Sequence, residues 1–340
     1  MRPVAERSGG LRSLLGRFVG REIESRIADN FRDLDPAGVE RITASLKESY
    51  FSRSYLAERQ ADSLDAYLAS DAGGSDLRDH LSRRLEGFRT TVVPWLDHAK
   101  PLSGSTVLEI GCGTGSSTVA LAEQGAKVTA VDVAEESLAV ARDRCRVYGL
   151  DVELLECNAT EVGGRLSDRR FDFVILFACL EHMTHGERMI AMTDTWGMLS
   201  PGALWCVVET PNRLWFFDHH TSLLPFYPWL PDDLALLYSR FSPRPSFRGS
   251  YPECTGDAMQ RFLRRGRGVS YHEFDLTLKR AEELRVISSL PLYLRGRSLR
   301  REVAWRRSLD HRFESFLARV GPAIHRGFYQ PSLDLIIVKE

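Results

Sequence analysis

The sequence lacks the features that mark several large classes of protein. No uninterrupted run of 18 apolar residues occurs among its 340 residues, so we expect no membrane-spanning helix. The apolar stretch at 11–20 contains Arg12 and Arg17, which argues against a secretory signal peptide. There is no internal repeat and no low-complexity tract. These absences favour a globular, cytoplasmic protein.

Cysteine and charge exclude further classes. The six cysteines include no C-x-x-C pair, and Cys179-x-x-His182 by itself cannot complete a zinc site. We therefore expect reduced, mostly buried thiols. A formal net charge of −1 gives the chain no overall attraction to nucleic acid or to an anionic membrane. An apolar content of 43% is ample for a packed core.

The most informative stretch is a glycine-rich loop that follows an apolar strand. Residues 107–115 read Val-Leu-Glu-Ile-Gly-Cys-Gly-Thr-Gly, and Asp132 follows at the tip of the next expected strand. Glycine has no Cβ, so such a loop can turn at positive φ and let a ligand lie against its backbone. A carboxylate at Asp132 is placed to accept hydrogen bonds from two vicinal ribose hydroxyls. The pattern predicts a site for a nucleoside-containing ligand.

The spacing of this loop argues against two common phosphate-binding sites. A dinucleotide fingerprint, G-x-G-x-x-G, would place its third glycine at Ser116, whereas the third glycine here is Gly115. No Gly-Lys-Ser/Thr follows, which excludes a Walker loop. Glu109, before the first glycine, would repel a pyrophosphate and attract a cation. The loop therefore favours a positively charged ligand.

Strand and helix signals alternate through the middle of the chain. Helical stretches at 116–124 and 135–148 end at Gly125 and Gly149, which suit C-terminal caps. The β-α-β order predicts a parallel sheet with helices on both faces and a ligand site beyond the carboxyl ends of its strands. The expected strands of this region are 106–110, 127–131, 152–155, 171–177 and 203–208.

The flanking regions have a different character. Residues 1–100 are polar and helical in period, with an apolar stripe at Ile23, Ile27, Phe31 and Leu34 and an expected loop at 71–75. An aromatic insertion with three close prolines, which argue against a long helix or a central strand, occupies about 214–269.

The C-terminal part returns to regular structure. A capping box at Ser270 predicts a helix through about Glu283. Two strands, at 284–290 and 333–338, are expected on either side of a helix over 298–319.

The loop at 107–115, together with Asp132, resembles motif I of the class I S-adenosylmethionine-dependent methyltransferases of the small-molecule type. Family-like signals continue in order at 158–159, 171–174, 179–182, 199–203 and 209–213. The resemblance implies an α/β fold, a Rossmann-like, seven-stranded, doubly wound sheet that is parallel with an antiparallel edge strand. Residues 101–340 would form this domain, with a substrate lid at about 214–269. Residues 1–100 would form a helical extension that covers the cofactor and substrate site.

The resemblance also implies residue roles toward S-adenosylmethionine. Asp132 would bind the ribose, Val133 would pack on the adenine, and Asn158 would pair with the adenine amino group through its amide oxygen beside Ala159. Phe177 and Ala178 would line the methionine portion. A helix with Tyr50, Tyr55 and Arg59 would fold over the cofactor, and Arg84 or Arg89 would pair with its carboxylate. The loop residues Glu109, Gly111, Cys112, Gly113, Thr114 and Gly115 would hold the amino-acid end and the sulfonium side.

Histidines are the candidate general bases, because only histidine titrates near neutral pH without help. His182 follows the fourth strand beside Glu181, while His219 and His220 begin the lid. A helix cap or a lid-anchoring hydrogen bond explains each histidine equally well, and at most one of the adjacent pair should face the substrate. A metal site from His219, His220, Asp218 and Glu181 is an alternative, but no ligand spacing is diagnostic, so no metal is predicted.

These features predict methyl transfer to a hydroxyl oxygen of a small molecule, such as a sugar or a secondary metabolite. No N-P-P-Y/F sequence, typical of many amino-group and nucleic-acid enzymes, follows the fourth strand. A carboxylate, an amino sugar and RNA are alternative acceptors. RNA is the least favoured, because basic runs such as those at 261–267 and 295–301 are more often solvated faces. The alternative outside enzymes is a non-catalytic cofactor-binding module. We expect no membrane or nucleic-acid partner, and a homodimer would form through the N-terminal helices.

Overall fold

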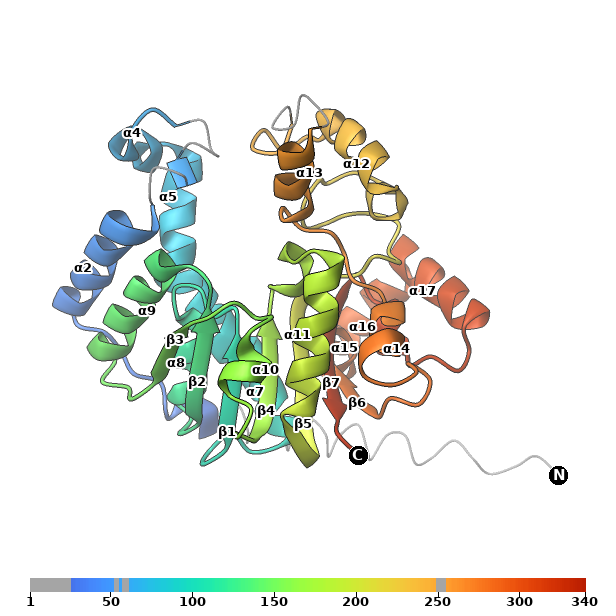
Figure 1. Cartoon of the computed structure of the whole chain (residues 1–340), viewed down its shortest axis with the longest axis horizontal. Coiled ribbons are helices and arrows are strands. Elements are labelled where there is room, and N and C mark those ends of the chain that lie inside the picture. Colours follow the sequence, from blue (N-terminus) through green and yellow to red (C-terminus); the bar gives the residue numbers. More distant parts are fainter. Residues whose placement is uncertain (1–25, 52–54, 57–60, 249–254) are drawn as a thin grey trace.

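A computed structural model describes residues 26–51, 55–56, 61–248 and 255–340 (Figure 1). Ile23, Arg59 and the sixth cysteine, Cys254, lie outside these residues. The strands form one sheet in the order β3-β2-β1-β4-β5-β7-β6. They are β1 (Thr106–Ile110), β2 (Lys127–Asp132), β3 (Glu153–Glu156), β4 (Phe171–Phe177), β5 (Leu199–Pro211), β6 (Val286–Ser289) and β7 (Ser332–Val338).

The strand directions confirm the predicted Rossmann-like sheet. Strands β1 to β5 pair in parallel, whereas β7 is antiparallel to both β5 and β6. The reversed strand therefore lies one place in from the edge, and β6 is the outermost strand. All seven strands fall where the sequence predicts them, to within a few residues at their ends.

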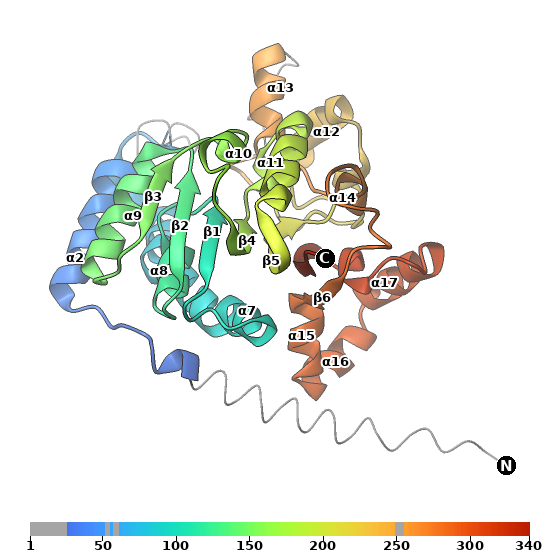
Figure 2. The same ribbon diagram turned by 60° about the horizontal axis from the view of Figure 1, so that its bottom comes forward.

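Helices cover both faces of the sheet (Figure 2). Because strand side chains alternate, Val107 of β1 joins one hydrophobic cluster while Leu108 and Ile110 join another. The first cluster is built with α2 (Pro36–Ser45), α7 (Val93–Ala99), α8 (Ser116–Ala122) and α9 (Glu135–Val147). The second is built with α10 (Val162–Arg165), α11 (His185–Gly197) and α14 (Tyr271–Thr277).

The N-terminal extension shares the core of the sheet. Ile42, Leu46 and Leu85 are buried in the same cluster as α8 and α9. The loop predicted at 71–75 is wrong, because helix follows Ser70 directly: its Oγ accepts a hydrogen bond from the Gly73 N–H at 3.1 Å. After α4 (Leu64–Ala69), helix continues through 71–99, with α5 (Asp71–Arg78) first, then α6 (Arg84–Gly87) between wider π-helical turns, and finally α7.

The insertion at 214–269 has a small core of its own, in which Tyr227, Phe247 and Phe262 are buried together. It contains α12 (Asp232–Tyr238) and α13 (Gly256–Leu263), both short, as the close prolines predict. In Figure 1, both helix pairs extend above the sheet at the top of the view. Helices α4 and α5 lie on the left, and α12 and α13 lie further to the right.

Two C-terminal helices differ from their predictions. The capping box at Ser270 is confirmed, but α14 ends at Thr277 rather than near Glu283. The helix expected over 298–319 is two helices, α16 (Leu299–Arg306) and α17 (Leu309–Val320), after α15 (Leu290–Gly296). They separate because the Ser308 Oγ accepts a hydrogen bond from the His311 N–H at 3.1 Å and starts a new helix.

Two expectations drawn from absences concern the described residues alone. Within them, no helix has both the length and the apolar character needed to cross a bilayer. The five described cysteines are free thiols, and four of them are buried.

Arg144 joins the extension to the glycine-rich loop. This α9 side chain is fully buried, and it donates hydrogen bonds to the carbonyl oxygens of Thr114 at 2.8 Å, Leu81 at 3.3 Å and His80 at 2.5 Å. Burial lowers the pKa of Arg144 to about 10, so the guanidinium stays charged at neutral pH. One buried cation therefore hydrogen-bonds three carbonyl oxygens on two separate segments.

Replacing Arg144 tests this connection. Arg144→Met should lower the free energy of unfolding by about 3 kcal/mol, because a hydrogen bond to a charged group contributes about 1.5–3 kcal/mol and the carbonyls lose their donor. Urea denaturation followed by circular dichroism measures the change. Arg142→Met on the same helix is the matched control and should change stability little, since the ion pair of Arg142 with Glu135 is exposed. Equal stability of the two variants would contradict the assignment.

Candidate functional site

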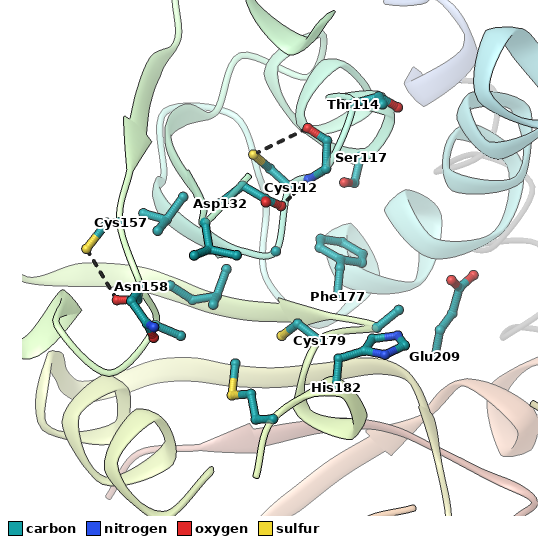
Figure 3. A pocket seen from close by; sticks show the side chains of 18 of the residues that line it. Cys112, Thr114, Ser117, Asp132, Cys157, Asn158, Phe177, Cys179, His182 and Glu209 are labelled. Carbon is teal, nitrogen blue, oxygen red and sulfur yellow. Dashed lines mark hydrogen bonds between the residues drawn. The ribbon is translucent and has the colours of Figure 1, made fainter. Parts of the chain in front are cut away.

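A cavity of about 370 Å³ lies beyond the carboxyl ends of β1, β2 and β4 (Figure 3). Its position is the one at which parallel α/β sheets bind ligands, and its size suits a small molecule or cofactor. Of the twelve residues predicted to hold the cofactor, ten line it: Gly111, Cys112, Gly113, Thr114, Asp132, Val133, Asn158, Ala159, Phe177 and Ala178.

The glycines of the loop serve different purposes. Gly111 has φ of +81°, and a Cβ there would lie 2.8 Å from the Cβ of Cys179. Gly113 has φ of +51° and meets nothing within 4 Å, so its open side is available to a ligand. Gly115 does not line the cavity: a Cβ there would lie 3.0 Å from Ala141 of α9. The ligand contact predicted for Gly115 is therefore replaced by close packing of α8 on α9.

Asp132 is held against this loop. One of its oxygens accepts a hydrogen bond from the Gly113 N–H at 2.7 Å, and the other accepts one from the Ala134 N–H at 2.9 Å. Burial raises the pKa of Asp132, and these backbone donors oppose that effect. Each oxygen keeps a further lone pair for a ligand, so the carboxylate can receive two hydroxyl groups at once.

Glu109 is not where the sequence places it. Its side chain is fully buried and absent from the cavity wall, and its two oxygens accept hydrogen bonds from the hydroxyls of Ser117 and Thr118. Burial raises its pKa to about 7. The argument that Glu109 stands at the mouth of the loop and attracts a cation is therefore wrong. Glu109 instead stabilises the loop by accepting hydrogen bonds from the first turn of α8.

The far end of the cavity suits a flat ring. Val133 leaves 66% of its surface exposed there, which is unusual for a large apolar side chain. The Asn158 oxygen already accepts two hydrogen bonds from Thr160, at 3.0 Å each. The Asn158 oxygen is therefore already occupied and does not suit the predicted contact with the adenine amino group. A contact of Asn158 with adenine would instead be donated by its NH₂ group.

The extension supplies one wall of the cavity, through Arg84 and Phe88. The Phe88 ring lies 5.2 Å from that of Phe177, edge to face. The alternative cation, Arg89, is buried and bonded to both oxygens of Glu123, so its predicted role with the cofactor is wrong.

Two tyrosines of the extension also have structural partners outside the wall. The Tyr50 ring packs 4.3 Å from that of His80, and the Tyr55 hydroxyl donates to Asp76 at 2.6 Å. The tyrosines therefore belong to the packing of the extension, behind the cavity.

A second cavity, of about 290 Å³, lies between the end of β5 and the insertion. Its wall includes Phe217, Tyr227 and both His219 and His220. Sequence reasoning expected at most one of these histidines to face such a site. Both do so because the chain turns at Asp218, whose carboxylate accepts hydrogen bonds from the next N–H groups at 220, 221 and 222.

Glu209, which sequence reasoning did not propose as a site residue, borders both cavities. It has φ of +59°, a backbone conformation that non-glycine residues rarely adopt and that often marks functional positions. Its N–H donates to Asp334 at 2.6 Å. Glu209 is exposed at the cavity walls, and partial desolvation by its surroundings, followed by the charge of Asp334, raises its pKa. Ala178, at the end of neighbouring β4, also has positive φ.

A cluster of titratable groups lies where the two cavities approach each other. His182 borders the first cavity, His220 borders the second, and their rings lie 5.7 Å apart. Partial desolvation lowers the pKa of both histidines, that of His220 to about 4, and full burial raises the pKa of the adjacent Glu181 to about 8. Among the described residues, these three side chains form a group with ligand atoms close enough to hold a metal ion.

Comparison with known proteins agrees with the loop and the fold. Residues 107–202 match a family model described as a methyltransferase domain. The ubiquinone biosynthesis O-methyltransferase of Pseudomonas entomophila (strain L48) is 34% identical over 110 residues, 32% of this chain and 46% of that protein. That of Pseudomonas paraeruginosa is 37% identical over 91 residues, 27% of this chain and 39% of that protein. The chain thus spans less than half the length of these curated relatives.

Solved structures show a more distant likeness. Magnesium protoporphyrin IX methyltransferase from Synechocystis PCC 6803, determined with bound SAM, is 20% identical, with a TM-score of 0.36, over 54% of this chain and 80% of that one. The matched residues 107–202 contain the glycine-rich loop, Asp132 and the end of β4. Residues 107–202 therefore form a methyltransferase domain, as the resemblance of the loop to the class I S-adenosylmethionine-dependent family predicts.

Proposed function

We propose that this protein transfers the methyl group of S-adenosylmethionine to a hydroxyl oxygen of a small molecule. The observation that carries the proposal is the pair of cavities bordered by one carboxylate, Glu209. The first cavity would hold the cofactor and the second the acceptor. The relatives named as O-methyltransferases support oxygen as the receiving atom.

The cofactor would lie along the ends of the strands. Its ribose would donate hydrogen bonds to Asp132, and its adenine would pack on Val133. The methionine portion would run past Phe177 and Ala178, with its carboxylate toward Arg84. This orientation would turn the sulfonium methyl group toward Glu209 and His182, which lie at the same end of the wall as Phe177 (Figure 3).

The reaction is an in-line displacement at carbon. A lone pair of the acceptor oxygen forms the new O–CH₃ bond while the S–CH₃ bond breaks, and that electron pair remains on sulfur as S-adenosylhomocysteine leaves. The hydroxyl proton must also depart. Since the cofactor carries the activated methyl group, the protein has to orient the two reactants, exclude water and receive the proton.

Glu209 is the proton acceptor best placed for this transfer, because it borders both cavities. Because the pKa of Glu209 is raised toward neutral pH, its carboxylate is a stronger base than that of an ordinary glutamate. The lowered pKa of His182 and His220 makes these imidazoles weaker bases than an ordinary histidine. We therefore assign the histidines, including His219 in the acceptor cavity, to orienting the hydroxyl group.

The acceptor cavity suits a compact ring with polar substituents. Phe217, Tyr227 and Pro228 offer apolar surface, while His219 and His220 offer hydrogen bonds. This lining favours a sugar or an aromatic metabolite over a carboxylate.

The basic runs give RNA little support as an acceptor. Arg267 and Arg295 are buried, and Arg264 forms an ion pair with Glu187. These side chains are therefore engaged in packing rather than presented together as a surface for phosphates. A homodimer remains a proposal, and it would use the polar outer face of the extension, because the apolar side is packed against the sheet.

Binding of S-adenosylhomocysteine tests the cofactor site. Asp132→Ala should weaken binding at least about 50-fold in isothermal titration, because loss of two hydrogen bonds to a charged acceptor costs about 3 kcal/mol. Glu156→Ala is the matched control: Glu156 ends the neighbouring strand β3 outside the cavity wall and should bind like the wild type. Unchanged affinity in Asp132→Ala would refute the assignment.

Transfer itself is tested with a labelled methyl donor and a panel of sugars, phenols, hydroxy acids and RNA, with products identified by mass spectrometry. We expect a hydroxylated ring to be labelled. Tight cofactor binding with no labelled product from any class would instead favour a non-catalytic module.

Glu209→Gln tests the base, once an acceptor is known. The substitution should lower kcat about 100-fold, the typical contribution of a general base, and leave binding of S-adenosylhomocysteine within about 3-fold. In the wild type, kcat/KM should rise with pH through the raised pKa of Glu209, because only the carboxylate form accepts a proton. If kcat/KM of Glu209→Gln shows the same rise with pH, a group other than Glu209 accepts the proton.

A further inference from the structure

We infer that Glu181, His182 and His220 form a binding site for a divalent transition-metal ion, with Zn²⁺ the best match. The site lies between the two cavities. The first two residues belong to the turn that follows β4, and the third belongs to the insertion. Residues far apart in the sequence thus converge on one point.

The spacing of the three side chains fits a shared ion better than hydrogen bonds. Their ligand atoms all lie within 4.8 Å of one another. Oε1 of Glu181 is 3.9 Å from Nε2 of His182 and 3.7 Å from Nε2 of His220. Both distances exceed the limit of about 3.2 Å for a good hydrogen bond. Ligands bound at about 2.0–2.2 Å to one tetrahedral ion lie roughly 3.4 Å apart, so a small contraction would complete the site.

The Glu181 carboxylate is only partly satisfied by its surroundings, which include the nearby charge of Arg188. The side chain is fully buried, and Oε2 receives a long hydrogen bond from Thr210, at 3.4 Å. Among the described residues, Oε1 has no hydrogen-bond partner. A buried carboxyl oxygen without a partner is costly, whether the group is ionised or protonated. A cation between Glu181 and the two imidazoles removes that cost.

Both histidines are held in the tautomer that a metal requires. Nδ1 of His182 is 2.8 Å from the carbonyl oxygen of Arg264, so it carries the proton and donates it. Nδ1 of His220 is 3.0 Å from the Thr221 hydroxyl, which itself donates to the Gly266 carbonyl at 2.8 Å and so accepts from the ring. In each ring, Nε2 therefore keeps its lone pair and faces Glu181. Metal-binding histidines are commonly anchored in this way through their other nitrogen.

The ligand set indicates the kind of ion and its role. Two imidazoles and one carboxylate suit Zn²⁺ rather than Mg²⁺, which prefers oxygen ligands and water. Three protein ligands leave a fourth position open, as in catalytic zinc sites. An acceptor hydroxyl bound there would have a lowered pKa and would lose its proton more readily to Glu209. This role rests on the proposed function, whereas metal binding itself does not.

Metal titration of the full chain tests the site. Protein treated with a chelator and then dialysed should bind one equivalent of Zn²⁺ by isothermal titration. Co²⁺ in its place should give the visible absorption of a four-coordinate ion. Glu181→Gln and His220→Ala should each weaken binding at least about 100-fold, more than loss of an outer-shell partner does. His219→Ala is the matched control, because His219 is adjacent in sequence but outside the trio, and should bind like the wild type.

Three results would overturn the inference. They are no stoichiometric binding by the wild type, no four-coordinate Co²⁺ spectrum, or equal affinities of His220→Ala and His219→Ala. Thermal unfolding without metal checks the fold of each variant. If Glu181→Gln does not fold, His220→Ala still decides, because His220 is only partly buried and lies in the insertion.

The proposed function fails by a different result. A protein that binds Zn²⁺ through the trio but transfers no labelled methyl group keeps the metal site and loses the proposed reaction. If the chain transfers the methyl group but binds no metal, the proposed reaction stands and the metal site is refuted.

Discussion

The hydrogen bonds that hold the glycine-rich loop against the ends of β1 and β2 are the constraint on which the rest of the structure depends. Asp132 accepts a hydrogen bond from the Gly113 N–H, and Arg144 donates one to the Thr114 carbonyl oxygen. From below, Glu109 bonds the hydroxyls that open α8. A loop built from glycines has no conformation of its own, so these surrounding groups set its shape. The cofactor cavity is the open side of this arrangement.

The second cavity shows how an insertion adds specificity to a common sheet. The insertion carries its own small core, so it holds its shape while presenting a wall to the end of β5. At that end Glu209 adopts positive φ, and its N–H is fixed by Asp334 of β7. A strained backbone held by a neighbouring strand places one carboxylate beside both cavities. The proposed methyl transfer and the proposed metal site both depend on that meeting of sheet and insertion.

Electrostatics separate the groups at the junction into different roles. Desolvation, complete for Glu181 and partial for the others, raises the pKa of Glu181 and Glu209 and lowers that of His182 and His220, because it disfavours each charged form. Neutral imidazoles are suited to holding an ion or a hydroxyl, whereas a carboxylate of raised pKa is suited to taking a proton. In the two proposals, His182 and His220, predicted from the sequence as bases, would instead bind a metal ion or orient the acceptor hydroxyl.

Local pattern alone determined the strands, the capping glycines and most of the loop, because these follow from side-chain alternation and from backbone freedom at single residues. It failed where a tertiary partner overrode the local preference. Ser70 turned the Gly-Gly pair at 73–74 into helix, and Ser308 divided one expected helix into two. Only the tertiary structure decided that Glu109 faces α8, that Arg89 is bonded to Glu123, and that Glu209 borders both cavities. The direction in which a side chain points depends on elements distant in the sequence, and no local pattern encodes it.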